Sequence, residues 1–383
     1  MSSKENKKVV DFYLKGNELK RDIISDDGRT IAQHLYSSMI LALAINKEFD
    51  ASEDISKVIR MIMFDGIALT DDDFHCSDYL KNGLKYDKEI EEKNKMTTFD
   101  SIFAMKCRIL DLKLHDLIIN NKDKCQYEIY KLAIKNGIIT PRTLEENKKY
   151  QEIFRFYYEN SKLENKVRSG WDDNHWAVNG KRESVADHVY GTMVLALSME
   201  DKFEEKVDID KVLQTLLIHE IGEIKIGDLT PFDNVTREEK QKIEHAAMKD
   251  VLGNLNGNHE LFKMLLDFDD EKTSVSKFSH LCDKLEADLQ SKVYEDRNEH
   301  RNLDDQENNV VFKNKKIQKM LAQASTAFDI WYLWDKDIYK NSRSFSSILE
   351  YIKSNKIAFE KEYQLVYKTN KQSQIWLFGQ NMV

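Results

Sequence analysis

Proline is nearly absent from this sequence. Only Pro141 and Pro231 occur among 383 residues, so few positions are barred from a helix interior by a missing backbone amide hydrogen. Leucine, isoleucine, lysine and glutamate dominate instead, a composition that favours long helices over a turn-rich sheet fold. The composition therefore predicts an all-α protein.

Paired cysteines and long apolar runs are also missing. The four cysteines, Cys76, Cys107, Cys125 and Cys282, form no Cys-x-x-Cys pair, which argues against a zinc ribbon or a disulfide framework. Neither the polar residues 1–8 nor any later stretch supplies a signal region or the roughly 18 to 20 uncharged residues of a membrane span. We expect a soluble cytoplasmic protein with reduced thiols and no membrane contact.

Basic charge is in deficit. The formal net charge is -9 and the isoelectric point is about 5.7, so the surface repels polyanions on average. Extended nucleic-acid binding is therefore not expected. A small phosphorylated substrate remains compatible with this charge.

The length and an internal repeat predict two domains, because 383 residues exceed the size at which one core usually stops growing. Three segments recur later in the same order: residues 12–19 as 156–163, residues 32–43 as 186–197, and residues 55–59 as 209–213. The second copy gains an insertion near residues 171–180. Repeats of this length indicate two tandem helical domains rather than a solenoid, at residues 1–140 and 146–383.

The two copies differ where chemistry would be expected. Three positions of the second copy change in the first: His219 to Asp65, Glu220 to Gly66 and Asp283 to Arg108. His34 remains opposite His188. A site that has exchanged one carboxylate for no side chain and another for a guanidinium is not expected to hold a divalent cation, so we predict that the first copy binds no metal.

Three segments of the second copy, residues 182–188, 219–228 and 280–286, bring imidazoles and carboxylates onto separate helix-like stretches. Apolar residues at helical spacing predict those helices at residues 185–199, 212–221 and 278–293. These are the groups that bind a divalent metal and activate water on it. Each segment alone is weak, since a lone histidine is more often a hydrogen-bonded core residue and His-Glu here lacks the zincin pattern. Their ordered combination predicts a hydrolase.

The ordered motifs resemble those of the HD-domain phosphohydrolases, named for the pattern His, then His-Asp, then Asp. The stretches Ser184–His188, His219–Thr230 and Asp283–Gln290 are most similar to the 5'-deoxynucleotidase branch, and the resemblance covers about residues 150–355. It implies HD-type helical domains, one divalent ion and a small nucleotide substrate. The implied metal ligands are His188, His219, Glu220 and Asp283.

The resemblance also implies roles around the metal. Glu223, four residues after His219 and so expected on the same helix face, would be the general acid/base. Asp228 would lie near the sugar of the substrate. Arg168 and Arg182 compete for the phosphate, and Arg168 is preferred because Arg-Ser-Gly-Trp is similar to the family's arginine and tryptophan near the nucleotide.

Three residues keep two interpretations each. Trp171 would either stack on a base or sugar or pack in the core. Thr230 would either contact the substrate or cap the next segment. Glu220 stands where the family has aspartate, and its extra methylene either preserves a ligand or disturbs the site.

We expect a metal-dependent phosphohydrolase that cleaves a nucleoside 5'-monophosphate, with a deoxynucleotide favoured. One alternative is a phosphodiesterase or triphosphohydrolase acting on a cyclic nucleotide, a nucleoside triphosphate or a short oligonucleotide. Another is a non-catalytic module that senses nucleotides or binds protein. The donor set leaves the metal open among Mn, Co, Fe, Zn, Ni and Mg, and a homodimer is compatible with the sequence.

Overall fold

The computed structural model describes residues 1–24, 28–52, 54–70, 74–230, 232, 236–306 and 308–358. These residues form helices and short 3-10 turns, with isolated β-bridges and no strand, which confirms the all-α prediction. The α-helices are α1 (Ser3–Glu18), α2 (Ile31–Phe49), α3 (Ile55–Thr70), α4 (Gly83–Lys95), α5 (Phe99–Ile119), α6 (Gln126–Lys135), α7 (Leu144–Ser161), α8 (Val185–Met199), α9 (Ile209–Ile218), α10 (Glu223–Ile226), α11 (Arg237–Leu252), α12 (Asn258–Asp270), α13 (Ser274–Asp296), α14 (Lys315–Leu321), α15 (Ala327–Asp335) and α16 (Arg343–Ser354).

Side-chain caps fix where the central helices begin. Thr30 precedes α2 and accepts the amide of Gln33, and Ser184 precedes α8 and accepts the amide of Asp187. In both cases the third residue bonds back to the capping residue, which completes a capping box. Such a cap stabilises a helix by about 1 kcal/mol.

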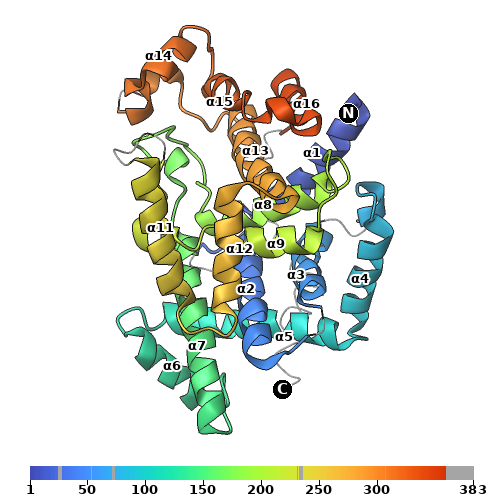
Figure 1. The fold of residues 1–383 in the computed structure, drawn as a ribbon, viewed down its shortest axis with the longest axis vertical. Coiled ribbons are helices and arrows are strands. Elements are labelled where there is room, and N and C mark those ends of the chain that lie inside the picture. The colour runs from blue at the N-terminus through green and yellow to red at the C-terminus, as the bar shows by residue number, and fades with distance from the viewer. Residues whose placement is uncertain are drawn as a thin grey trace.

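Helices α2 and α8 lie at the centre of the molecule (Figure 1). Helix α2 contacts α3, α5, α7 and α8, while α8 contacts α1, α2, α9 and α13. Every residue of α8 is buried, because other helices pack around it. The functional motif that α8 carries is therefore held rigidly.

One hydrophobic core runs through both halves of the chain. It includes Phe12 and Leu43 from the first half together with Val194 and Leu289 from the second. The division at residues 140–146 stays a prediction, and residues 359–383 of the predicted second domain lie outside the described residues.

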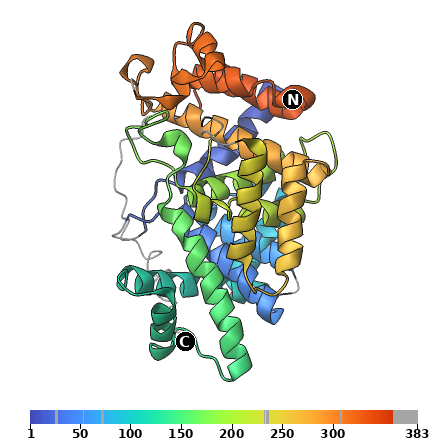
Figure 2. The same cartoon turned by 60° about the vertical axis from the view of Figure 1, so that its left-hand side comes forward.

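The two ends of the molecule are built by different helices. Helix α6 and the start of α7 lie at one end, and α14, α15 and α16 lie at the other (Figures 1 and 2). A second, smaller core of aromatic residues lies near the α15 end, where Trp171 stacks on Trp331 with ring centroids 5.0 Å apart and meets Tyr294 edge-on. This cluster anchors the loop that carries Arg168.

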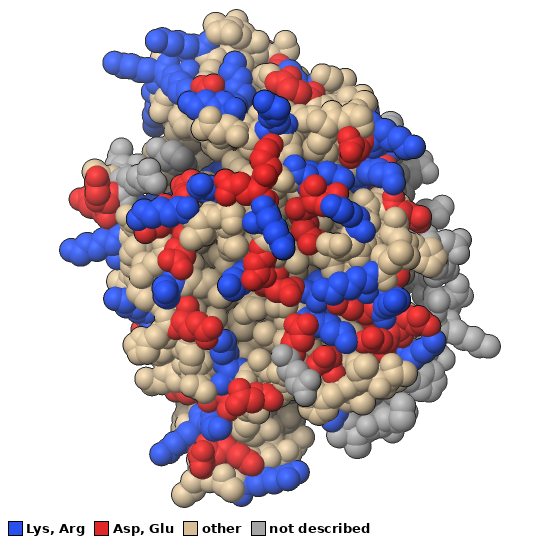
Figure 3. All heavy atoms as spheres, turned by 45° about the vertical axis from the view of Figure 1, so that its right-hand side comes forward, with Lys and Arg blue, Asp and Glu red and all other residues tan. Residues whose placement is uncertain are grey.

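The surface mixes charges of both signs. Across most of the face in Figure 3, Lys and Arg side chains intermingle with Asp and Glu, and basic side chains gather mainly toward the top of the view. Every helix of the described residues is too short or too polar to span a lipid bilayer.

Candidate metal centre

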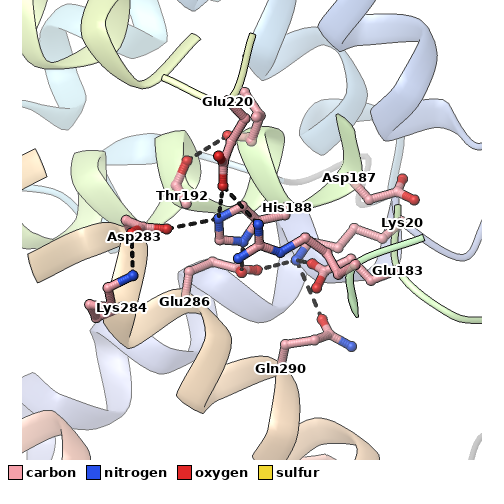
Figure 4. Close-up of polar contacts among 12 residues, drawn as sticks. Lys20, Glu183, Asp187, His188, Thr192, Glu220, Asp283, Lys284, Glu286 and Gln290 are labelled. Atoms are coloured by element: carbon pink, nitrogen blue, oxygen red, sulfur yellow. Dashed lines mark hydrogen bonds and ion pairs between the residues drawn. The ribbon is translucent and has the colours of Figure 1, made fainter. Parts of the chain in front are cut away.

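Four predicted ligands converge at one point. One donor atom each from His188, His219, Glu220 and Asp283 lies within 4.8 Å of the others. Asp283 Oδ1 is 3.0 Å from Nε2 of His188 and 3.7 Å from Nε2 of His219. Glu220 Oε1 is 3.7 Å and 3.6 Å from the same two nitrogens. Figure 4 shows His188 at the centre of this cluster.

Two helices and one turn supply these side chains, and one prediction about them is wrong. Helix α8 carries His188 and α13 carries Asp283, as the spacing predicts, but α9 ends at Ile218 instead of continuing to residue 221. Residues 219–222 form a turn, and Glu223 begins α10. Glu223 therefore does not share a helix with His219.

The turn after α9 has a local cause. Nδ1 of His219 bonds to the carbonyl oxygen of Leu216 at 2.7 Å. The amides of Ile221 and Glu223 bond to carbonyls three residues back, at 3.2 Å and 3.0 Å, and Gly222 weakens any continuation of the helix by about 1 kcal/mol. These tight turns take the place of further helix after Ile218, and they position Glu220 and Glu223 beside the cluster.

The Nδ1 atoms of both imidazoles, which face away from the cluster, already have hydrogen-bond partners. Nδ1 of His188 lies 2.6 Å from the carboxylate of Glu286, and Nδ1 of His219 meets the carbonyl of Leu216. Since both acceptors require an N–H donor, Nδ1 of each ring carries a proton, and Nε2 is the nitrogen that faces the cluster. This is how outer contacts orient histidine ligands in metal sites.

Arg168, Glu223 and Asp228 flank the four ligands. The Nη1 atom of Arg168 lies 2.8 Å from Glu220, 3.4 Å from Asp228 and 3.6 Å from Glu223. Asp228 is fixed by the backbone amide of Ser169, which donates to its Oδ2 at 2.7 Å, and the Ser169 hydroxyl donates to the Asp228 carbonyl. The loop before α8 and the turn after α10 are thereby joined beside the cluster.

The carboxylates of the site differ in proton affinity. Burial, together with the charges of Asp228 and Glu220, raises the pKa of Glu223 well above its usual value. Burial would also raise the pKa of Glu220, but His219 and Arg168 outweigh it and lower that pKa to about 2. Burial likewise opposes ionisation of Asp283, yet Lys284 and the imidazole of His188 hold its pKa well below the ordinary value. The site therefore combines two carboxylates of lowered pKa with one carboxyl group, Glu223, whose pKa is raised.

For three other predicted site residues, the contacts described here are with residues other than the four predicted ligands. Arg182 does not reach the cluster, because its guanidinium pairs with Asp173 at 2.6 Å. Trp171 is buried and donates to Glu183 at 2.9 Å, so it is a core residue with no face open to a nucleotide. Thr230 accepts the amide of Phe232 at 3.2 Å, a local contact of the capping type.

Sequence reasoning missed several residues around the ligands. Lys284 lies 3.0 Å from Asp283, Lys166 bonds to the backbone carbonyl of Glu223, and Glu286 backs His188. Glu286 had a signal in the sequence, since it follows Asp283 by three residues and so shares its helix face. A separate surface hollow of about 1040 Å³, lined by residues such as His300 and Thr326, contains none of the four ligands.

Comparisons with known proteins agree with this geometry. An HD domain matches residues 144–325. The 5'-deoxynucleotidase HDDC2 of Dictyostelium discoideum is 31% identical over 153 residues, which are 38% of this chain and 77% of that protein. The chain belongs to the HD-domain family. Its members also include the HDDC2 of Bos taurus, 36% identical over 118 residues that span 30% of this chain and 56% of the bovine protein.

The HD-domain assignment makes the protein a hydrolase. Among solved structures, a protein from Pyrococcus horikoshii OT3 aligns over 51% of this chain and 96% of its own at 19% identity. The TM-score of 0.36 is too low to add to the assignment.

HD domains bind a divalent metal, and the residues present fit one. Nε2 of His219 is buried and makes no hydrogen bond within the described part of the chain, and the carboxylate oxygens of Glu220 and Asp283 that it faces lie 3.6 Å and 3.7 Å away, beyond hydrogen-bond distance. A buried imidazole nitrogen that faces two carboxylates provides the donor atoms that a metal cation binds. Two nitrogens and two oxygens form a donor set suited to Mn, Fe, Co, Ni or Zn.

Proposed function

We propose that this HD-domain hydrolase is a metal-dependent phosphohydrolase that cleaves the phosphomonoester of a nucleoside 5'-monophosphate, with deoxynucleotides favoured. The observation that carries the proposal is the convergence of His188, His219, Glu220 and Asp283 beside the carboxyl group of Glu223 and the cation of Arg168. Both relatives described above are named 5'-deoxynucleotidases, which supports the substrate class.

The four ligands would hold one divalent ion. When bound, such an ion lowers the pKa of water and polarises a phosphoryl oxygen. The chain itself supplies the orientation, because Glu286 and the Leu216 carbonyl fix the two imidazoles. His219 and Asp283 are almost fully buried, which limits competing water.

Glu223 would move the proton. Its raised pKa favours the protonated carboxyl group, which is the form that can donate to the leaving oxygen of the sugar as the ester bond breaks. Its Oε2 makes no hydrogen bond in the described structure and is free to take this role. The group would then recover a proton from the water that attacks phosphorus.

Arg168 would bind the phosphate. Its guanidinium carries a permanent charge and can meet two phosphate oxygens at once. It already lies against three carboxylates of the site, so a phosphate would displace part of that network. Asp228, fixed by Ser169, would face the sugar.

Phosphate release is the test. The full chain is incubated with deoxy- and ribonucleoside 5'-monophosphates and with Mn²⁺, Co²⁺, Mg²⁺, Zn²⁺ or no metal, beside Asp283→Asn. A matched control is Asp11→Asn, which breaks only an exposed pair with Lys7. We expect metal-dependent release that is lost in Asp283→Asn and retained in Asp11→Asn.

The products decide between this function and its rivals. Inorganic phosphate from monophosphates supports the proposal. Pyrophosphate or tripolyphosphate from a nucleoside triphosphate, or a linear nucleotide from a cyclic one, without release from monophosphates, would replace it. Tight nucleotide binding without turnover under every metal would contradict catalysis on nucleotides altogether.

A further inference from the structure

His188 is supported by a buried ion network that begins in the N-terminal half of the chain. Glu286, which contacts Nδ1 of His188, also contacts Nζ of Lys20 and accepts the hydroxyl of Tyr13 at 2.8 Å. Lys20 donates in addition to Glu183 at 2.6 Å. The network contains three ionisable side chains that are at most 3% exposed: Lys20, Glu183 and Glu286. Figure 4 shows this chain of contacts from Lys20 to His188.

Helix α8 leaves room for the ammonium group. A Cβ atom at Gly191, one turn after His188, would lie 2.4 Å from Oε1 of Glu286 and 2.5 Å from Nζ of Lys20. Any side chain at Gly191 would therefore displace the ion pair. The network therefore requires a glycine at position 191.

A network of the same design but with different charges surrounds His34. Nδ1 of His34 is 2.5 Å from Asp111, and Asp111 accepts from Arg29 and from the hydroxyl of Tyr157, both at 2.8 Å. Arg29 also donates to Glu164 at 2.6 Å. A histidine, a carboxylate, a tyrosine and a buried ion pair thus recur together.

The repeat in the sequence relates the two networks position by position. It matches Tyr13 with Tyr157, Lys20 with Glu164, Arg29 with Glu183, and His34 with His188. The backbone repeats as well, since Ile23 bridges Thr30 as Val167 bridges Ser184. Each half therefore sends one charged side chain across to the other: Lys20 toward α8 and α13, and Glu164 toward α2 and α5.

We propose that Lys20 is a positioning residue of the metal centre, and that the N-terminal half completes the site rather than only packing against it. The ammonium group fixes Glu286, and Glu286 fixes the tautomer and orientation of His188. This role rests on the proposed metal centre. Without Lys20, two buried carboxylates lose their shared cation, a state that a low-dielectric interior does not tolerate. Glu286 is then no longer held in place by a cation, and His188 loses a fixed acceptor for its Nδ1.

Cobalt binding by the full-length chain tests this role without relying on activity. The variants are Lys20→Met and the double variant Lys20→Met/Glu183→Gln, in which one carboxylate is removed together with its cation so that folding is less affected. The matched control is Glu164→Gln, which breaks the equivalent buried contact around His34. Co²⁺ affinity and its visible absorption spectrum are measured beside thermal unfolding.

We expect both Lys20 variants to bind Co²⁺ about 10- to 100-fold more weakly, the usual effect of losing an outer contact to a metal ligand, with an altered spectrum. Glu164→Gln should lose stability but keep its Co²⁺ affinity within about 3-fold. Unchanged affinity and spectrum in the folded double variant would overturn the role of Lys20, as would an equal loss of affinity in Glu164→Gln. Failure of the wild-type chain to bind Co²⁺ would overturn it too. Co²⁺ binding that depends on Lys20, in a protein that releases no phosphate, would support the role while the proposed substrate fails.

Discussion

Glu220 departs from the family pattern, yet its carboxylate still lies beside the two histidines of the cluster. Its side chain is one methylene longer than the aspartate of the HD pair, yet Oε1 comes to 3.6 Å and 3.7 Å from the two imidazole nitrogens. Because Glu220 lies in a turn and not in α9, its backbone is not bound to helical spacing. This geometry supports a ligand role for the longer carboxylate.

Glu223→Gln should separate catalysis from metal binding. Glutamine keeps the size of the side chain but cannot donate a carboxyl proton, so we expect kcat for phosphate release to fall about 10²- to 10⁴-fold. Co²⁺ affinity should stay within about 3-fold. Glu91→Gln, which alters only an exposed pair with Lys95, is the control. A kcat equal to that of wild type would rule out the acid/base role.

His300→Gln should change how stability depends on pH. Burial lowers the pKa of His300 to about 4, although bonds to backbone carbonyls oppose the shift. Between pH 6.5 and 4 the unfolded chain then binds a proton that the folded chain does not. The stability advantage of wild type over the variant should therefore shrink as the pH falls, by about 1.4 kcal/mol per pH unit in mid-window. Urea unfolding of both proteins at pH 7, 6 and 5 measures this difference, and a constant difference would refute it.

At the scale of elements, α1 packs on α8, and α7 packs on α2. Each half thus places its first helix against the second helix of the other half. The contact between α1 and α8 is close, since a Cβ atom at Gly16 would lie 2.8 Å from both Cγ atoms of Val194. The position of Lys20 beyond α1 depends on this packing.

Gly16→Leu should separate α1 from α8. The added side chain has no space against Val194, so we expect a loss of about 1 to 3 kcal/mol in the free energy of unfolding. Lys4→Leu, on an exposed face of the same helix, should change stability by no more than about 0.5 kcal/mol. Chemical denaturation compares the two variants, and equal effects would show that the close contact is not specific.

The helices and the order of the site residues could be predicted because they depend on local patterns. Apolar spacing identified α8 and most of α13, and the family motifs predicted four ligands whose side chains the fold brings together. The break after Ile218 could not be predicted, since it depends on the bond from His219 to the Leu216 carbonyl. The contact between Lys20 and Glu286 could not be predicted either, because the matching residue in the second half, Glu164, carries the opposite charge.

At the scale of the whole molecule, one core joins both halves, so metal binding should stabilise them together. At free Co²⁺ of 100 times the dissociation constant, the free energy of unfolding should rise by about 2.7 kcal/mol. Calorimetry should show a single transition that shifts upward with Co²⁺ in wild type and stays fixed in Asp283→Asn. Two transitions, only one of which responds to Co²⁺, would contradict a shared core.

The long reach from Lys20 to Glu286 also sets an order of events during synthesis. The two residues are 266 positions apart in the chain. At about 5–20 residues per second, a ribosome delivers Glu286 on the order of tens of seconds after Lys20. Until then the lysine can pair only with Glu183, and His188 has no Glu286 carboxylate to accept from its Nδ1. The metal centre is therefore among the last parts of the protein to be completed, and a nascent chain cannot acquire its full affinity for metal before α13 has emerged.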